Sequence, residues 1–391
     1  MKGRGMSDSL SVSFAGVSLP NPVILASATP GWDGQRLQHA LAAGAGAVVC
    51  KTIGPPAEWA AHPRNGRLHI VKVGNKRIGM INLELFTTKS VDDWLERDLA
   101  VAKQGGGRLI ASVLALPDPA DTAVLAARVE ATGLADFLEL NVSCPMPAGT
   151  VGMHIGKDAS KTHEQVKAVR SKVSLPLLVK MTPNIADIGL VAHACEEAGA
   201  NGLTVSNSVR SFAGVDIYTG KPILGAFGGY TGPAIKPIVQ RLVIETAQSC
   251  RLPISAVGGV ATWQDVVEYI MLGATTVQVA TAVMWNGVEA LGKLLQGLER
   301  FMGEQGYRRV DEMRGITLPY ITTVEEVARQ PRKVAVLDQY LCKQCGLCPK
   351  VCFYDALHLN EELSIDRDSC DGCGLCVELC PVGALRLEDL R

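Results

Sequence analysis

Eight of the twelve cysteines in this 391-residue chain lie between residues 342 and 380, and they constrain its fold more than any other feature. They form two runs with the same spacing, C-x2-C-x2-C-x3-C: Cys342, Cys345, Cys348 and Cys352, then Cys370, Cys373, Cys376 and Cys380. Three thiolates at intervals of three residues can surround one face of a cubane cluster, and the fourth is turned toward a second cluster. The spacing therefore predicts a small domain folded around two [4Fe-4S] clusters.

The predicted ligand sets cross between the two runs. We assign Cys342, Cys345, Cys348 and Cys380 to cluster 1, and Cys370, Cys373, Cys376 and Cys352 to cluster 2. Gly346, Gly372 and Gly374 allow backbone amides to approach the cluster sulfurs. Paired CxxC sequences also build zinc ribbons, so zinc is the alternative metal. Two equal runs of four cysteines favour iron-sulfur clusters over zinc.

Upstream of the cysteines, short apolar runs alternate with longer segments of helical period, which is the pattern of a parallel α/β sheet. The strand-like runs are 23–26, 47–50, 109–113, 137–140, 177–179, 202–205, 254–257 and 276–279. The helical segments are 35–45, 120–133, 160–173, 187–199, 234–249, 262–273 and 286–302. Eight strands are the number that a (β/α)8 TIM barrel requires. A doubly wound open sheet is the main alternative, but no glycine-rich dinucleotide fingerprint follows the first strand.

We therefore predict an α/β fold in three parts. A (β/α)8 TIM barrel covers residues 1–315, a connector covers 316–335, and a C-terminal two-cluster ferredoxin-like domain covers 336–391. Two cysteines of the barrel, Cys195 and Cys250, lie in or just after helical segments, so we expect them to be packing residues.

Polar side chains gather where the predicted barrel strands end, which is where such barrels carry their catalytic groups. Asn141, Ser143 and Cys144 follow the fourth strand. Lys51 and Lys180 end apolar runs, and burying a cation is costly without an anionic partner. A single such lysine is often half of a structural ion pair. Two at equivalent strand ends favour a shared anionic or electron-rich ligand.

Glycines and small residues follow the last two strands, at the positions where such barrels hold a phosphate on backbone N–H groups. They are Gly258, Gly259, Ala280 and Thr281, and Gly228 and Gly229 in the preceding loop add further donors. The alternative is ordinary turn chemistry, for which two glycines need no ligand. A phosphate at one rim beside a centre of Lys and Asn side chains fits a phosphorylated ring cofactor such as FMN. A flavin can exchange single electrons with clusters and a hydride with a substrate.

Several motifs resemble those of the FMN-dependent class 1 dihydroorotate dehydrogenases over residues 15–302. With residues 336–387 included, the chain resembles the dihydropyrimidine dehydrogenases, and most of all their bacterial iron-sulfur subunit. The motifs are VVCKT at Lys51, INLEL at Asn82 and Glu84, LNVSCP at Asn141, Ser143 and Cys144, VKMTPN at Lys180 and Asn184, SNS at Asn207 and Ser208, GGYTGPAI from Gly228, and VGGV at Gly258 and Gly259.

The resemblance implies a mechanism for oxidising or reducing a C–C bond. Cys144 would be the general acid/base that exchanges a proton with one carbon, while FMN N5 exchanges a hydride with the neighbouring carbon. Ser143 would assist orientation or proton relay. Lys180 would offset the negative charge that gathers near N1 of the reduced flavin.

The resemblance also implies two sets of contacts. The substrate contacts would be Asn82, Asn141, Asn207 and Ser208, since an Asn amide offers both a donor and an acceptor to an amide edge. The FMN contacts would be Ala26, Ser27, Lys51, Thr52, Glu84, Ser112, Asn141, Lys180, Ser206, Gly228, Gly229, Gly258, Gly259, Ala280 and Thr281.

The chain departs from the family directly after Cys144-Pro145. Met146, Pro147 and Ala148 replace residues that include a polar substrate contact in the family, and the loop up to residue 158 is shorter. His154 in this loop is a candidate replacement. We therefore expect reduction or formation of a C–C double bond next to a carbonyl in a pyrimidine-like cyclic amide. The alternatives are the same chemistry on a non-pyrimidine ring or enone, and an electron-transfer subunit of a larger redox complex.

Charge and hydropathy limit the partners. The formal net charge of -1 gives no reason to expect nucleic acid or an anionic membrane as partner. No apolar run reaches the roughly 18 residues that span a bilayer, and the N-terminus lacks the apolar core of a signal peptide, so we expect a cytoplasmic protein. Because no nicotinamide-binding fingerprint is evident, electrons should pass to or from a separate partner, an NAD(P)H/FAD subunit or a ferredoxin. We expect a homo- or hetero-oligomer.

Overall fold

A computed structural model of the chain describes residues 8–55, 63–64, 66–145 and 151–390. The chain divides into two compact units, Met1–Leu318 and Pro319–Arg391, and each is described by itself. Among the helices of the described residues, none is both long and apolar enough to cross a membrane.

Eight parallel strands close the first unit into a barrel whose order, β10-β13-β14-β3-β4-β7-β8-β9, follows the chain. The strands are β3 (Val23–Leu25), β4 (Ala47–Val49), β7 (Arg108–Leu114), β8 (Phe137–Asn141), β9 (Leu177–Lys180), β10 (Gly202–Val205), β13 (Ile254–Val257) and β14 (Ala274–Val279). Each of the eight predicted apolar runs is a barrel strand. The predicted TIM barrel is therefore confirmed, and the open sheet is excluded.

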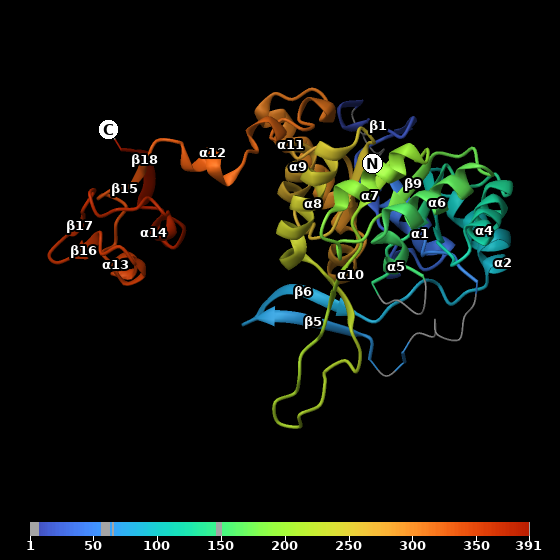
Figure 1. The fold of residues 1–391 in the computed structure, drawn as a ribbon, viewed down its shortest axis with the longest axis horizontal. Helices are drawn as coiled ribbons and strands as arrows, with labels where there is room; N and C mark the ends of the chain where they lie inside the picture. The colour runs from blue at the N-terminus through green and yellow to red at the C-terminus, as the bar shows by residue number, and fades with distance from the viewer. Residues whose placement is uncertain (1–7, 56–62, 65, 146–150, 391) are drawn as a thin grey trace, which may run out of the picture. The chain divides into compact units, whose positions relative to one another are not determined.

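Helices form a ring outside the strands (Figure 1). They are α1 (Gly34–Ala42), α3 (Leu99–Lys103), α4 (Pro119–Ala131), α6 (Ala159–Arg170), α7 (Ile188–Glu197), α8 (Lys236–Ser249), α9 (Trp263–Met271) and α11 (Ala290–Gln305). Shorter helices are α2 (Val91–Asp93), a π-helical turn (Trp94–Asp98), α5 (Met153–Gly156) and α10 (Thr281–Asn286), and 3-10 turns cover Asp8–Leu10, Thr29–Gly31, Pro233–Ile235, Val310–Glu312 and Leu318–Tyr320. The sequence analysis missed the helical stretch from Val91 to Lys103, where four acidic residues interrupt the apolar pattern.

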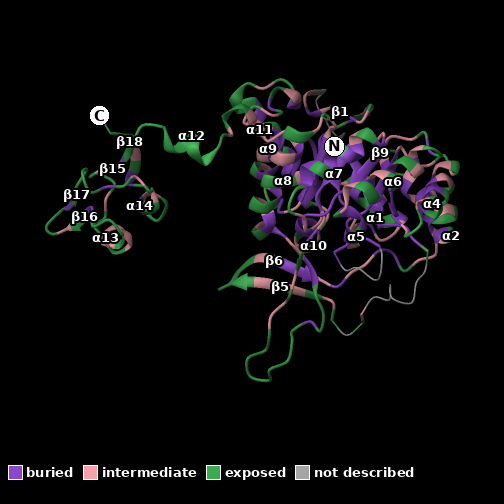
Figure 2. Ribbon diagram, in the orientation of Figure 1, coloured by how far each residue is buried: buried purple, intermediate pink, exposed green. Residues whose placement is uncertain are grey.

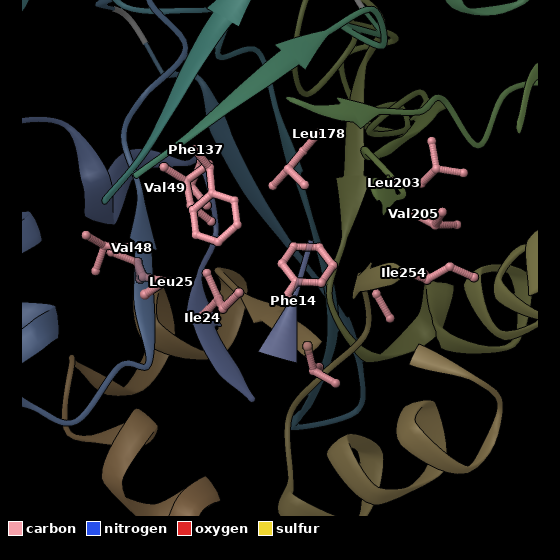
Figure 3. Packing of buried hydrophobic residues seen from close by; sticks show 14 of the residues in the cluster. Phe14, Ile24, Leu25, Val48, Val49, Phe137, Leu178, Leu203, Val205 and Ile254 are labelled. Carbon is pink, nitrogen blue, oxygen red and sulfur yellow. The ribbon is translucent and has the colours of Figure 1, made fainter. Parts of the chain in front are cut away.

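The barrel strands are buried on both faces, which is why they appear in the sequence as continuous apolar runs. Figure 2 shows buried residues in the barrel interior and exposed residues on the outer faces of the helices. Phe14 packs against Phe137 at the start of β8, with ring centroids 6.0 Å apart (Figure 3). Phe14 belongs to a hairpin of β1 (Val12–Phe14) and β2 (Val17–Leu19), which the sequence analysis missed. The hairpin therefore packs at the N-terminal ends of the strands and leaves the C-terminal ends for the site.

A four-stranded antiparallel sheet is inserted in the loops after β4 and β10. Its order is β11 (Val209–Ser211), β12 (Gly228–Thr231), β6 (Lys76–Asn82) and β5 (Leu68–Val73). Asn82 on β6 pairs with Gly229 on β12, so two loops that are far apart in sequence join at the C-terminal end of the barrel. This sheet was also missed, and it carries Asn82 and Glu84 toward the barrel mouth.

The second unit has a small core of its own. Antiparallel pairs are β15 (Lys333–Leu337) with β18 (Leu385–Asp389), and β16 (Leu357–Leu359) with β17 (Leu363–Ile365). Its helices are α12 (Val324–Ala328), α13 (Leu347–Val351) and α14 (Leu375–Glu378). Val334, Leu357 and Leu385 are buried together with Cys370 and Cys376. Strand β15 begins at Lys333, inside the range that was predicted as connector.

Candidate active site

The C-terminal ends of the barrel strands open into a cavity with about 1050 Å³ of space between its lining atoms, counting the open mouth. Sixteen of the predicted site residues line it: Ala26, Ser27, Lys51, Thr52, Asn82, Glu84, Asn141, Cys144, Lys180, Ser206, Asn207, Ser208, Gly258, Gly259, Ala280 and Thr281. Their individual roles remain predictions.

Four other predicted residues lie behind the lining and support it. Ser112 Oγ is 3.0 Å from Thr52 Oγ1. Ser143 Oγ donates to Asn141 Oδ1 at 2.8 Å and accepts from Asn207 Nδ2 at 2.9 Å. The carbonyl of Gly229 accepts from Asn82 Nδ2 at 2.9 Å, and a Cβ on Gly228 would lie 2.6 Å from the Asn82 carbonyl oxygen. These residues therefore set the orientation of the side chains that do face the cavity.

Cys144 lies just beyond the end of β8, and only 9% of its surface is exposed. Its carbonyl accepts a hydrogen bond from Met153 N at 3.0 Å, at the start of α5. Gly152 has a left-handed φ of 64°, and a Cβ there would lie 2.9 Å from the Cβ of Cys144. The approach of α5 thus fixes Cys144 at the cavity wall. Met146, Pro147 and Ala148 lie outside the described residues, and His154 is exposed on α5.

Asparagine side chains form a hydrogen-bonded row along the cavity. Asn141 Nδ2 donates to Thr52 Oγ1 at 3.0 Å, and Asn207 Oδ1 accepts from Ser208 N at 2.8 Å. Ser143 joins the two asparagines. Because an Asn amide has two donor hydrogens and two acceptor lone pairs, each of these side chains keeps hydrogen-bonding capacity for a ligand while the protein fixes its position.

Lys51 is paired with Glu84 inside the cavity. Lys51 Nζ is 3.7 Å from Glu84 Oε2, and Arg67 Nε donates to Glu84 Oε1 at 2.9 Å. Thr29 Oγ1 also donates to Glu84. Burial lowers the pKa of Lys51, and Glu84 opposes this shift. Burial would raise the pKa of Glu84, but Lys51, Thr29 and Arg67 outweigh it and hold that pKa below its ordinary value.

Lys180 is paired with Glu139, a residue that the sequence analysis overlooked. Lys180 Nζ is 3.8 Å from Glu139 Oε1. Each buried lysine thus has a protein carboxylate within 4 Å, and both also line the cavity. The shared ligand that the two strand ends favour stays a prediction. The sequence pattern could have identified Glu139 as an interior residue. Phe137, Glu139 and Asn141 are alternate residues of β8, so their side chains point to the same, interior face of the strand.

The other end of the cavity is lined by backbone. Gly258 and Gly259 have φ values of 137° and 79°, and a Cβ on Gly259 would lie 2.6 Å from Lys236 Cα at the start of α8. Only glycine fits this approach. Ala280 and Thr281 line the same cavity at the start of α10. Backbone N–H groups at such strand ends suit a phosphate. Together with the Lys and Asn side chains and the apolar walls, this donor set fits FMN.

The second unit separates its eight cysteines into two quartets. One space of about 340 Å³ is lined by Cys342, Cys345, Cys348 and Cys380, and another of about 330 Å³ is lined by Cys352, Cys370, Cys373 and Cys376. These are the two sets assigned from spacing. Backbone N–H groups donate to the sulfurs of Cys342, Cys370 and Cys380 at 3.2 to 3.4 Å.

The backbone around the quartets also suits clusters. Gly346, Gly372 and Gly374 have φ values of 70°, 74° and 81°, and a Cβ on Gly372 would lie 2.2 Å from the Lys333 carbonyl oxygen. Within the residues that the structure describes, no three His, Cys, Asp or Glu side chains come close enough to hold a single metal ion. The left-handed glycines and the backbone N–H groups that donate to sulfur suit iron-sulfur clusters at the two quartets.

Comparison with known proteins gives two family matches. Residues 9–302 match the family described as dihydroorotate dehydrogenase, and residues 335–387 match the 4Fe-4S dicluster domain. The chain is 40% identical over 308 residues to the catalytic subunit of dihydroorotate dehydrogenase B (NAD(+)) of Methanothermobacter thermautotrophicus, covering 78% of this chain and 98% of that protein. It is 33% identical over 369 residues to the NAD-dependent dihydropyrimidine dehydrogenase subunit PreA of Escherichia coli, covering 91% and 88%. The chloroplastic dihydropyrimidine dehydrogenase (NADP(+)) of Arabidopsis thaliana is 32% identical over 357 residues, covering 86% of this chain and 83% of that protein.

Proposed function

Since the chain belongs to the dihydroorotate dehydrogenase family, we propose that it interconverts a single and a double C–C bond next to a carbonyl in an uncharged, pyrimidine-like cyclic amide. It is an oxidoreductase of CH-CH groups, and its cofactors are FMN in the barrel and two [4Fe-4S] clusters in the C-terminal domain. The observation that carries the proposal is that Cys144 lines one cavity together with Asn141, Asn207 and Ser208.

The proposed proton transfer uses Cys144. FMN, when bound, supplies the hydride chemistry. In the reducing direction, Cys144 Sγ donates its proton to one carbon of the double bond while the neighbouring carbon gains a hydride. In the oxidising direction, Cys144 accepts that proton back. The asparagine row holds C=O groups of the ring, because Asn141 Nδ2 and Asn207 Nδ2 each keep one hydrogen beyond the bond that they donate within the protein.

The charges of the cavity favour a ring without a carboxylate. Lys51 and Lys180 are the cationic side chains among the described residues that line it, and each already faces a protein carboxylate. Glu84 is held as an anion by Lys51, Thr29 and Arg67. A substrate carboxylate would have to displace one of these pairings, at a cost in desolvation and repulsion. The site therefore favours an uncharged dihydropyrimidine over dihydroorotate, which carries a carboxylate.

A substrate panel tests this proposal. The anaerobic holoenzyme is mixed with dihydrouracil, dihydrothymine, dihydroorotate and a saturated cyclic ketone, and reduction of FMN is followed by loss of flavin absorbance. We expect the two neutral dihydropyrimidines to reduce FMN faster than dihydroorotate. Faster reduction by dihydroorotate would overturn the charge argument, and reduction by the ketone alone would favour a non-pyrimidine substrate, which the departure at Met146 suggests.

Cys144→Ser tests the proton-transfer role. We expect FMN to remain bound and reduction to slow by about 10² to 10⁴, the usual contribution of a general acid or base. Cys250→Ser is the matched control, because Cys250 is half-buried at the end of α8 and does not line the cavity. Equal rates for the Cys144 variant and the control would exclude the role.

We further propose a separate redox partner. The relatives in Methanothermobacter and Escherichia coli are named as subunits of NAD-dependent enzymes. The two cysteine quartets suit a relay of single electrons between FMN and such a partner. The remaining alternative is an electron-transfer subunit without catalysis, and a purified protein that carries clusters but no FMN would favour it.

A further inference from the structure

Glu139 is a buried carboxylate inside the barrel with no role in the chemistry above. Its side chain is 0% exposed, and the side chain of its partner Lys180 is 5% exposed. Glu139 Oε2 accepts from Thr204 Oγ1 at 2.9 Å and from Gln278 Nε2 at 3.4 Å. Gln278 Nε2 is also 3.3 Å from Thr204 Oγ1. Three strands other than its own thus hold this carboxylate in one position.

The surroundings of Glu139 form a polar layer across the barrel. Thr204 is in register with Lys180 on β9 and with Ser255 on β13, and Ser255 is in register with Thr276 on β14. Partners in register on parallel strands point to the same face, so this row shares the interior with Glu139. Ser255 Oγ and Thr276 Oγ1 are buried without a hydrogen-bond partner in the described structure. The layer is polar enough to retain an ion pair where an apolar core would not.

The ion pair of Lys180 and Glu139 connects this polar layer to the cavity. Lys180 lines the cavity, whereas Glu139 does not, so the lysine faces the ligand and the carboxylate lies beneath it. Among the described residues that line the cavity, the other titratable groups are Cys144 after β8, and Lys51 and Glu84, which pair with each other. Glu139 is therefore the carboxylate dedicated to Lys180.

We propose that Glu139 is the positioning residue that holds the ammonium group of Lys180 directed at the flavin, and so controls how well the site stabilises negative charge on the ring. This inference rests on the proposed placement of FMN beside Lys180. A buried ammonium depends on its carboxylate partner, because burial of an unpaired cation carries a large desolvation cost. Without Glu139, the ammonium group of Lys180 is no longer held at its place in the cavity wall, and it no longer offsets negative charge on the flavin.

Sulfite is the probe for this charge. It adds to oxidised flavin and bleaches its visible band, and the anionic adduct is stabilised by a nearby cation. The holoenzyme and Glu139→Gln are titrated with sulfite at the same pH, and the sulfite dissociation constant of the variant is divided by that of the wild type. We expect this ratio to be at least about tenfold, where tenfold is about 1.4 kcal/mol.

Three further variants make the outcome specific. Lys180→Met should weaken sulfite binding at least as much as Glu139→Gln does, because the cation is absent. Thr276→Val is the matched control, since it removes a buried hydroxyl of the same polar layer without removing a charge. The double variant Glu139→Gln/Lys180→Met leaves neither charge unpaired. It should bind sulfite within about threefold of Lys180→Met if Glu139 acts only through the lysine.

The results that would refute this inference differ from those that would refute the proposed function. A ratio near one for Glu139→Gln, or tighter sulfite binding by this variant than by the wild type, would refute the inference while FMN remains bound. If Glu139→Gln does not retain FMN, the double variant decides, and a difference beyond about threefold from Lys180→Met refutes the inference. A wild-type protein that carries no FMN would instead refute the proposed function.

Discussion

Gly152 is the residue on which the position of Cys144 depends most directly. It combines a left-handed φ with close contact, since an added Cβ would lie 2.7 Å from the Cys144 carbonyl oxygen. The left-handed φ would strain the backbone of a residue with a side chain, and the added Cβ would overlap with Cys144. The position of Cys144 at the cavity wall therefore depends on Gly152 at the start of α5.

Gly152→Ala should consequently reduce activity and stability together. We expect a loss of about 1 to 3 kcal/mol in the free energy of unfolding, from the strained φ and the contact with Cys144, together with slower substrate turnover. Thermal unfolding and FMN reduction kinetics measure the two effects. Gly303→Ala is the control, because this glycine lies in α11 with nothing within 4 Å of an added Cβ, and alanine should stabilise a helix there. Similar behaviour of the two variants would contradict this explanation.

The sequence predicts which side chains share the cavity where a strand end or a spacing determines the neighbours. Lys51 follows β4, Asn141 and Lys180 end β8 and β9, and all three line the cavity because the strand ends meet at one mouth. Arg67 and Thr29 were missed because they reach Glu84 from separate loops, and no local pattern records that meeting. Met146 marks a departure from the family, yet its consequence depends on a loop outside the described residues.

At the scale of elements, the glycine end of the cavity is held by the start of two helices. Asp265, in the first turn of α9, accepts hydrogen bonds from Ala261 N and Thr262 N at 2.8 and 2.7 Å. Its other oxygen accepts from Lys236 Nζ at 2.6 Å, and Lys236 begins α8 and packs against Gly259. One carboxylate therefore caps α9 and joins it to α8 beside the proposed phosphate site.

Asp265→Asn should destabilise the protein in a pH-dependent way. Burial would raise the pKa of Asp265, but Lys236 and the backbone N–H groups hold it below the ordinary value of 3.8. A carboxylate with a depressed folded-state pKa contributes stability that is present above the unfolded-state pKa and is lost as the pH falls through the folded-state pKa. We expect a loss of about 1 to 2 kcal/mol near neutral pH, which shrinks as the pH falls below 3.8.

Thermal unfolding at a series of pH values measures the difference in stability between Asp265→Asn and the wild type. FMN should also dissociate faster from Asp265→Asn, because the loop at Gly259 loses its support. Glu245→Gln is the control, since Glu245 forms an exposed pair with Arg241 within α8. A stability difference between Asp265→Asn and wild type that persists unchanged below pH 3.8 would contradict the linkage argument.

The barrel strands and most helices could be predicted from sequence, whereas the inserted sheet could not. Strands buried on both faces give apolar runs of fixed length, as in β10 and β13. In contrast, β5 is largely exposed and β11 has three residues, so neither gives a clear periodicity. The two hairpins, β5 with β6 and β11 with β12, join through β6 and β12. This contact links segments more than a hundred residues apart in sequence, as between Asn82 and Gly229, which local patterns do not record.

At the scale of the whole molecule, the two units have separate cores of very different size. The barrel core extends from Leu10 to Met313, whereas the core of the second unit holds eight buried residues, two of which are Cys370 and Cys376. A domain with so small an apolar core usually needs disulfides or metal to fold. We infer that the clusters supply much of the stability of Pro319–Arg391, and that the barrel does not depend on them.

Cys373→Ser tests this division of stability in the full-length chain. Cys373 is exposed, so the change removes one thiolate of the predicted cluster 2 without leaving an apolar cavity. We expect about half of the iron to be lost for each bound FMN, and the unfolding transition of the C-terminal unit to shift to lower temperature. The barrel transition and the FMN content should match those of Cys250→Ser, which alters no predicted ligand. Calorimetry with iron and flavin analysis measures both units in one sample. Loss of FMN, or an equal shift of both transitions, would show that the barrel depends on the clusters.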